Sequence, residues 1–312
     1  MCAIYGFLQY GDKGLSNKML RKLIKNLSIE AEVRGTHATG ISYAKNGKMV
    51  TYKQPKPAHK VKLKFPKKTR AVIGHTRYTT QGSEKLNYNN HPFEGECKNG
   101  QFALAHNGVL WNDIELRIAN NLPDTHIETD SYIAVQLIEN QEYLDHYSLQ
   151  CMAELLQGSF MLTILREDNT LFLVKGDNPI ELYHFPELGL YVYASTKDIL
   201  DKALKATKIK GAYETIVLHE GDIFAINPDG TTESSQFDAE SAFYAGLERE
   251  IGKEEEEELR QILMWTDFYG IDEEDIYTML DYGWTTEDLW DMIDDPDVIT
   301  NEIMAIKENC VC

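Results

Sequence analysis

The chain begins Met1-Cys2-Ala3-Ile4-Tyr5-Gly6-Phe7, a short apolar stretch with a cysteine in second position. Methionine aminopeptidases remove an initiator methionine when the next side chain is small, and cysteine qualifies. The mature chain would then begin with Cys2, which would carry a thiol and a free α-amino group on one residue. The ordinary pKa of an α-amino group is about 7.7–8.0, so this amine can accept the thiol proton near neutral pH. The stretch therefore indicates an activated cysteine nucleophile, whereas the alternative is a second-position cysteine without a chemical role, as in many chains.

Further motifs follow Cys2 in the chain. One of them follows a strand-like run at residues 70–78, another ends a strand-like run at residues 101–110, and a third opens a helical pattern. In chain order the motifs are Arg34-Gly35-Thr36-His37-Ala38-Thr39-Gly40, Gly74-His75-Thr76-Arg77-Tyr78-Thr79-Thr80-Gln81-Gly82, Asn90-His91-Pro92-Phe93, Ala105-His106-Asn107-Gly108-Val109 and Glu128-Thr129-Asp130-Ser131.

Taken in this order, the motifs resemble those of the class II glutamine amidotransferases. These are N-terminal-nucleophile (Ntn) hydrolases, typified by the glutaminase domains of glucosamine-6-phosphate synthase and amidophosphoribosyltransferase. The resemblance covers roughly three quarters of the chain. It implies an α+β fold, an αββα sandwich of two antiparallel sheets with Cys2 at the end of a sheet.

The resemblance also implies a reaction. Cys2 would attack the side-chain amide carbon of glutamine, with its own α-amino group as the base that later protonates the departing ammonia. The side-chain amide of Asn107 and the backbone N–H of Gly108 would form the oxyanion hole. Water would then release glutamate from the thioester.

The remaining implied residues bind glutamine. Arg77 would hold the substrate α-carboxylate, Asp130 would pair with the α-ammonium, and Thr80 with neighbouring backbone would complete the pocket. The family often has Trp where this chain has Tyr78 and His where it has Gln81. Both positions belong to a segment that moves over bound glutamine in family members. Tyr78 keeps an aromatic face, whereas Gln81 can form hydrogen bonds but cannot carry charge.

Several of these residues also have simpler interpretations. Arg77 and Asp130 could form a structural salt bridge, and Asn107-Gly108 is an ordinary turn signal. Histidines at positions 75, 91 and 106 could suggest a metal, but their separations do not match short zinc-ligand spacings. We expect them to be packed or hydrogen-bonded side chains, and we expect neither a metal nor a cofactor.

Hydrophobic periodicity independently predicts antiparallel sheets with helices packed on them, because strand-like runs come in neighbouring pairs. Four helical faces are expected around residues 20–27, 133–138, 149–156 and 199–204, with Ser16 and Thr196 as N-caps of the first and last. Strands are expected at 2–10, 70–78, 101–110, 160–166, 170–175, 190–194 and 215–226.

Charge divides the chain into two parts. Residues up to Phe237 hold 27 acids and 27 bases, whereas those from Asp238 onward hold 23 acids and four bases. The whole net charge of −19 therefore lies in the last quarter, which predicts a domain at 2–237 and a small acidic all-helical domain at 238–312. A short repeat (271–281 and 284–294) supports a bundle of short helices. We expect the aromatic residues of this bundle to form its core; they are Trp265, Phe268, Tyr269, Trp284 and Trp290. The alternative is a protein-binding module for a basic partner.

A basic stretch interrupts the first part. Residues 45–70 hold ten bases and no acid, and Lys60-Val61-Lys62-Leu63-Lys64-Phe65 alternates between charged and apolar side chains. The alternation predicts a half-exposed edge strand protected by lysines. The alternative is a docking surface for the acidic tail or for a partner.

Composition excludes other classes of protein. A chain with 43% apolar residues can bury a core, and its net charge of −19 is unsuited to coating nucleic acid. No apolar run reaches the roughly 18 residues of a membrane span. The five scattered cysteines do not suggest a disulfide framework, and no secretory leader is evident. We therefore expect a cytoplasmic protein.

The expected partner follows from what the sequence after the motifs lacks. We recognise no sugar-isomerase domain, phosphoribosyl motif or ATP-pyrophosphatase loop there, which predicts a glutaminase that supplies ammonia to a separate synthase. The alternatives are hydrolysis of a γ-glutamyl amide conjugate and a non-catalytic, glutamine-binding regulatory protein.

Overall fold

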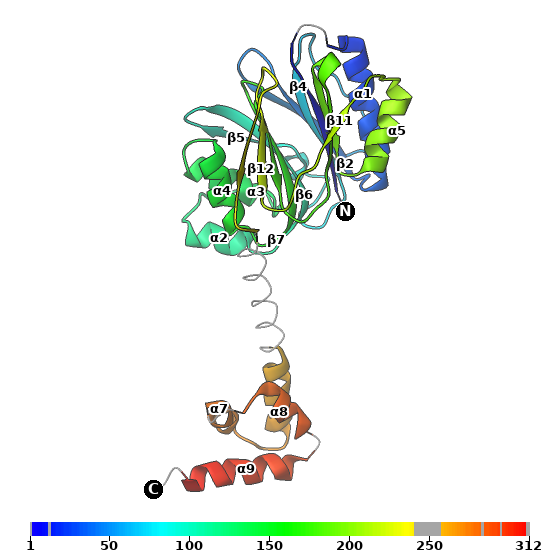
Figure 1. Cartoon of the computed structure of the whole chain (residues 1–312). Helices are drawn as coiled ribbons and strands as arrows, with labels where there is room; N and C mark the ends of the chain where they lie inside the picture. The colour runs from blue at the N-terminus through cyan, green and yellow to red at the C-terminus, as the bar shows by residue number, and fades with distance from the viewer. Residues whose placement is uncertain (1, 12–13, 240–256, 282–283, 294, 310–312) are drawn as a thin grey trace. The chain divides into compact units, whose positions relative to one another are not determined.

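The computed structural model describes residues 2–11, 14–239, 257–281, 284–293 and 295–309. The chain forms two compact units, Met1–Phe243 and Tyr244–Cys312, and each is considered by itself. In its described part, the first unit consists of two antiparallel sheets with helices against them, and the second consists of helices (Figure 1).

The first sheet has seven strands, and β1 lies in its interior between β10 and β4. Side chains alternate along β1: Tyr5 and Phe7 pack toward helices, whereas Ile4 and Leu8 pack toward the second sheet. Because both faces are buried, the strand is apolar along most of its length. In sheet order the strands are β11 (Glu214–Ile216), β9 (Glu181–Phe185), β10 (Leu190–Ala194), β1 (Ala3–Gln9), β4 (Ala71–Arg77), β2 (Ala38–Ala44) and β3 (Met49–Gln54).

Two helices, α1 (Asn17–Glu30) and α5 (Lys197–Thr207), cover the outer face of this sheet (Figure 1). The predicted N-caps are confirmed: Ser16 Oγ accepts from Met19 N at 3.4 Å, and Thr196 Oγ1 accepts from Ile199 N at 3.5 Å. The predicted apolar face of α1 is buried as well; its members are Leu20, Leu23, Ile24 and Leu27.

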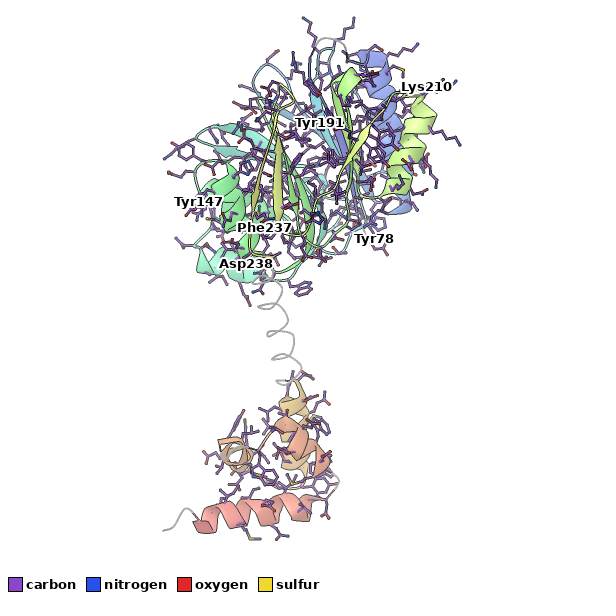
Figure 2. The ribbon with its side chains drawn as sticks, in the orientation of Figure 1. Tyr78, Tyr147, Tyr191, Lys210, Phe237 and Asp238 are labelled. Atoms are coloured by element: carbon purple, nitrogen blue, oxygen red, sulfur yellow. The ribbon has the colours of Figure 1, made fainter. Side chains whose placement is uncertain are left out.

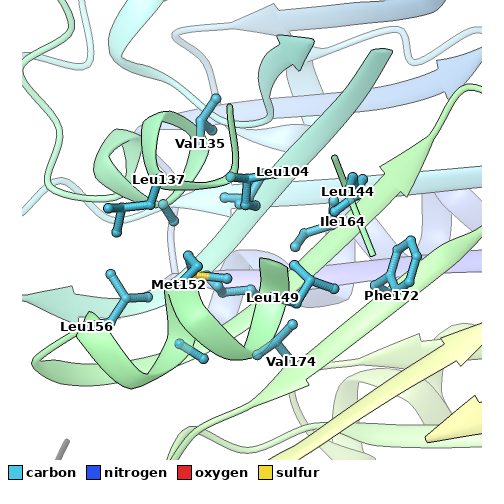
Figure 3. Packing of buried hydrophobic residues seen from close by; sticks show 14 of the residues in the cluster. Leu104, Val135, Leu137, Leu144, Leu149, Met152, Leu156, Ile164, Phe172 and Val174 are labelled. Atoms are coloured by element: carbon cyan, nitrogen blue, oxygen red, sulfur yellow. The ribbon is translucent and has the colours of Figure 1, made fainter. Parts of the chain in front are cut away.

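The second sheet has six strands, and its outer face is covered by α2 (Asp113–Ala119), α3 (Tyr132–Asn140) and α4 (His146–Leu155). Figure 3 shows Leu149 and Met152 of α4 in the same cluster as Leu104 and Ile164 of the sheet. In order the strands are β13 (Thr232–Gln236), β12 (Asp222–Ile226), β8 (Leu171–Lys175), β7 (Gly158–Arg166), β6 (Gly100–Leu110) and β5 (Phe93–Cys97). Short 3₁₀ helices are η1 (Ala31–Val33), η2 (Ala58–Lys60), η3 (Asn87–Asn89) and η4 (Pro186–Leu188).

A third apolar layer lies between the two sheets. Ile4 and Ile73 of the first sheet share this layer with Ala103, Met161 and Leu173 of the second. The layers therefore run helix, sheet, sheet, helix, which confirms the predicted αββα sandwich.

The inter-sheet layer gives the first prediction. Replacing Ile73, which is fully buried, by alanine removes apolar contacts from both sheets, so we expect a loss of about 2–5 kcal/mol in the free energy of unfolding. Ile118→Ala is the matched control, because this isoleucine is 75% exposed and should change stability by about 0.5 kcal/mol or less. Urea unfolding of both variants measures the difference, and equal midpoints would contradict this packing.

The predicted strand at residues 60–65 is wrong. The described residues 61–66 have no regular secondary structure, although burial does alternate along them. Phe65 is buried against Phe7 and Tyr43, and the Arg21 guanidinium of α1 donates hydrogen bonds to the Phe65 carbonyl. This backbone is thus held by a helix side chain rather than by a β-ladder. The edge strand of the sheet is β3 instead.

The second unit contains a helix at residues 257–268, followed by α7 (Glu273–Asp281), α8 (Thr286–Asp291) and α9 (Pro296–Asn309). Thr285 begins a capping box with Asp288. Trp265, Trp284 and Trp290 are partly buried against an isoleucine-rich core. Phe268 and Tyr269 are 81% and 51% exposed, so their predicted place in the core is wrong. None of the described helices is long and apolar enough to cross a membrane.

Candidate active site

Cys2 lies immediately before β1, beside the end of β4. The antiparallel register pairs Ala3 with Thr76, which brings the Cys2 side chain next to Tyr78. The Cys2 Sγ atom is 3.4 Å from both the backbone nitrogen and the backbone oxygen of Tyr78. Burial raises the pKa of the Cys2 thiol, while the Tyr78 hydrogen bond and the charge of Arg77 oppose that rise. The thiol therefore needs a base close by before it can react.

Asn107 lies in β6. Its side-chain oxygen has a hydrogen-bond partner, whereas its side-chain nitrogen has none among the described residues. Its Oδ1 atom is 3.5 Å from the Arg34 guanidinium, which also donates to the Cys2 carbonyl at 2.7 Å. Its Nδ2 atom is buried and has no hydrogen-bond partner among the residues that the structure describes. A buried amide donor without an acceptor costs free energy, so this N–H group is available for an incoming oxygen atom.

Gly108, the next residue, can only be glycine. Its φ angle is +153°, and a Cβ atom there would lie 1.8 Å from the Ser159 carbonyl oxygen of β7. Any side chain would push β6 away from β7, so the close approach of these strands requires glycine. The turn suggested by Asn107-Gly108 does not occur, because both residues lie within β6.

Arg77 ends β4 with its guanidinium buried and hydrogen-bonded. It donates to Asn90 Oδ1 at 2.8 Å and to the backbone carbonyls of Gln81 and Gly82. Burial lowers the pKa of Arg77, and the nearby Cys2 and Asp130 partly restore it. The segment 78–82 therefore folds back over the arginine that begins it.

Asp130 is buried in front of α3. Its Oδ2 atom accepts from the backbone nitrogen of Leu110 at 2.8 Å, and its Oδ1 atom accepts from Ser131 Oγ at 3.1 Å. The described residues show no ion pair between Asp130 and Arg77, which contradicts a structural salt bridge between them.

The segment after Arg77 is the more open side of the site. Tyr78 is half exposed at the surface of the first unit (Figure 2), and its ring stacks on His37. Thr80 is exposed, and Gln81 Nε2 lies 3.4 Å from Asp113 Oδ2 of α2. The structure thus joins Cys2 to Tyr78 directly and to Asn107 through Arg34, while Thr80 and Gln81 lie on the loop outside this network.

Three of the four histidines in the motifs, His75, His91 and His106, pack together. The His75 and His91 rings have centroids 4.2 Å apart, and His91 and His106 are 6.4 Å apart. Burial lowers the pKa of His75 to about 3 and holds the pKa values of His91 and His106 below their ordinary range. Among the described residues there is no group of His, Cys, Asp and Glu side chains suited to holding a metal ion.

Arg34 lies in one of the motifs, but its role could not be predicted from the sequence. Its contacts span 32 and 73 residues of the chain, so no local pattern could show them. The only sequence feature that could have indicated this role is the position of the arginine, in a glycine-containing segment next to a strand. Burial lowers the pKa of Arg34, as expected for a guanidinium held between backbone and side-chain oxygens.

Comparison with known proteins relates part of the chain to a family. Residues 28–144 match the family model described as glutamine amidotransferases class-II. This segment is therefore similar to the class II glutamine amidotransferases. It includes Asn107, Gly108, Arg77 and Asp130, whereas Cys2 precedes it.

Curated relatives of the chain are longer proteins. Glutamine–fructose-6-phosphate aminotransferase (isomerizing) of Staphylococcus aureus is 28% identical over 267 residues, which are 78% of this chain and 42% of that protein. The Staphylococcus epidermidis protein of the same name is 32% identical over 197 residues, 58% of this chain and 30% of its own. The chain thus spans about two-fifths of the length of the first of these relatives.

Solved structures share the fold of the first unit. Glutamine phosphoribosylpyrophosphate amidotransferase from Bacillus subtilis superposes with a TM-score of 0.58 at 21% identity, covering 76% of this chain and 49% of that one. A structure described as the allosteric regulatory enzyme of purine biosynthesis gives a TM-score of 0.59 at 22% identity, with the same coverage. Both likenesses support the two-sheet fold described above.

Proposed function

We propose that this chain hydrolyses the side-chain amide of glutamine, with Cys2 as the nucleophile after removal of Met1. Met1 lies outside the described residues, so its removal is part of the proposal. The observation that carries the proposal is the unpartnered, buried Nδ2 donor of Asn107, held by the same arginine that binds the Cys2 backbone. A nucleophile and an oxyanion donor fixed by one side chain suit acyl transfer.

The reaction proceeds in two halves. The Cys2 α-amino group takes the thiol proton, the thiolate sulfur attacks the amide carbon, and the oxyanion accepts hydrogen bonds from Asn107 Nδ2 and the Gly108 backbone N–H. The tetrahedral adduct collapses as the α-ammonium returns its proton to the leaving nitrogen, which departs as ammonia. Water, deprotonated by the same amine, then cleaves the thioester and releases glutamate.

Glutamine is held at its other end by two buried charges. The Arg77 guanidinium binds the α-carboxylate, which takes the place of the backbone carbonyls of Gln81 and Gly82. Asp130 binds the α-ammonium. Thr80, Tyr78 and Gln81 lie on the loop that closes over the amino acid, so the exposure of Thr80 and Tyr78 in the unliganded chain suits an open entrance.

The ammonia goes to a separate synthase in this proposal. We assign the glutaminase to residues 2–237 and partner docking to residues 238–312, whose excess of acids would suit a basic partner. The curated relatives are named glutamine–fructose-6-phosphate aminotransferases, and a name of this kind supports an acceptor for the ammonia released here. A reducing, cytoplasmic compartment would keep the Cys2 thiol free.

The test is a substrate panel with N-terminally trimmed protein. We expect equal amounts of glutamate and ammonia from glutamine, at a rate well above that from γ-glutamyl amides with larger leaving groups. Faster cleavage of a γ-glutamyl conjugate would transfer the same chemistry to that substrate class. Binding of glutamine without turnover, measured by calorimetry, would instead favour a regulatory protein.

A further inference from the structure

His37 lies beneath the segment that covers Cys2, in the short connection between η1 and β2. Its backbone nitrogen donates to the Arg77 carbonyl at 2.9 Å. Its ring stacks on Tyr78, with centroids 5.0 Å apart and planes inclined by 24°. Its Nδ1 atom lies 3.0 Å from the backbone nitrogen of Thr79. One residue therefore contacts three consecutive residues of the segment.

Tyr78, the middle one of these three residues, contacts the Cys2 sulfur. The Tyr78 N–H group points at the Cys2 sulfur, and the Tyr78 carbonyl faces the same atom. The peptide groups on both sides of Tyr78 are held by His37, through the Arg77 carbonyl and the Thr79 nitrogen. Gly35 packs closely against the same peptide group: a Cβ atom at position 35 would lie 2.6 Å from the Tyr78 nitrogen.

We propose that His37 is a positioning residue that holds the Tyr78 amide against the Cys2 sulfur. The inference rests on the proposed role of Cys2 as the nucleophile. Because a backbone N–H group points at Nδ1, that atom carries a lone pair, and the ring proton of neutral His37 lies on Nε2.

The consequence is chemical as well as structural. A fixed N–H donor favours the thiolate over the thiol, whereas the Tyr78 carbonyl, at the same 3.4 Å from the sulfur, repels the thiolate and would dominate if the N–H group moved away. Loss of the Nδ1 acceptor should free Thr79 and let the Tyr78 amide drift from the sulfur. The Cys2 thiol should then titrate at higher pH and react more slowly at neutral pH.

Two substitutions separate the acceptor from the aromatic stack. His37→Asn places a side-chain oxygen near the position of Nδ1 but removes the ring, whereas His37→Phe keeps an aromatic ring and removes the acceptor. His219→Ala is the control, because this histidine is exposed and lies at a turn outside the site.

The readout is the pH dependence of Cys2 alkylation by iodoacetamide in trimmed, full-length protein. Peptide mapping separates Cys2 from the other four cysteines of the chain, Cys97, Cys151, Cys310 and Cys312. We expect His37→Phe to slow alkylation at pH 7 by about fivefold to tenfold, and to move the alkylation profile to higher pH. His37→Asn should stay within about twofold of the wild type, like the control. Wild-type rates in His37→Phe, or equal slowing in both His37 variants, would overturn the proposal.

A measurement on the wild type covers the case in which a variant does not fold. The ¹⁵N chemical shifts of the His37 ring should show a protonated Nε2 and an unprotonated Nδ1, and a proton on Nδ1 would overturn the proposal. Alkylation needs no glutamine, so it is independent of the proposed glutaminase. A protein that alkylates as expected but releases no glutamate would contradict the glutaminase and leave the role of His37 intact.

Discussion

Replacing Cys2 by alanine should abolish glutamate release from glutamine, with a fall of about 10⁴-fold or more in kcat. Alanine leaves the α-amino group, the Arg34 contact to the backbone carbonyl and the Asn107 donor in place, but it removes the atom that forms the thioester. The residual rate would come from binding and electrostatic stabilisation of direct attack by water. Glutamine affinity should survive, because the residues proposed to bind it are unchanged.

Coupled detection of glutamate in trimmed protein measures this effect. Cys151→Ala is the matched control, since Cys151 is a free, partly exposed cysteine of α4 outside the site. It should keep the wild-type rate. Equal rates in Cys2→Ala and the wild type would remove the nucleophile from the mechanism, whatever the substrate.

Asn107→Ala should give the second-largest effect, a fall of about 10²–10³ in kcat with little change in the KM for glutamine. The Nδ2 donor has no partner among the residues with described positions, so its contribution should appear only when an oxyanion forms. Stability should change less than activity, because the substitution removes a donor that is already unsatisfied.

Asn112→Ala is the matched control for the loss of an asparagine. The Asn112 side chain bridges the Leu155 carbonyl and the Gln157 nitrogen, so its loss should lower stability and leave kcat close to the wild-type value. Steady-state kinetics separate the two outcomes. A fall of less than about threefold in Asn107→Ala would show that this amide does not stabilise the reacting oxygen.

Apolar periodicity predicted much of the fold, because the elements concerned are buried on one or both faces. The face of α1 and the strands β1, β4 and β6 are examples, since packing forces their side chains to follow the period of the element. One predicted strand at 215–226 is really β11 and β12, which belong to different sheets. An apolar run cannot reveal that the chain leaves one sheet and enters the other.

For two of the strands that periodicity missed, the structure shows the physical reason. β13 is polar along its length because it lies at the edge of its sheet and is largely exposed. β2 is buried but rich in small residues, since a Cβ atom at Gly40 would lie 2.2 Å from the His91 carbonyl. In both cases a neighbour that is remote in sequence decides which side chains the strand accepts.

Only the site residues whose roles follow from the sequence motifs could be predicted. Cys2, Arg77 and Asn107 were identified because they stand in ordered motifs that resemble a known family. Arg34 and His37 lie in the same motifs, but their importance depends on contacts to Asn107, Tyr78 and Thr79 that only the folded chain reveals.

Covalent labelling with diazo-oxo-norleucine, an electrophilic analogue of glutamine, tests the central claim most directly. Trimmed protein is incubated with the analogue, digested and mapped by mass spectrometry, alongside protein that retains Met1. The proposed mechanism predicts one adduct on the Cys2 sulfur of the trimmed chain, suppressed by glutamine and absent when Met1 is retained. No adduct on Cys2 of fully trimmed, folded protein would contradict it.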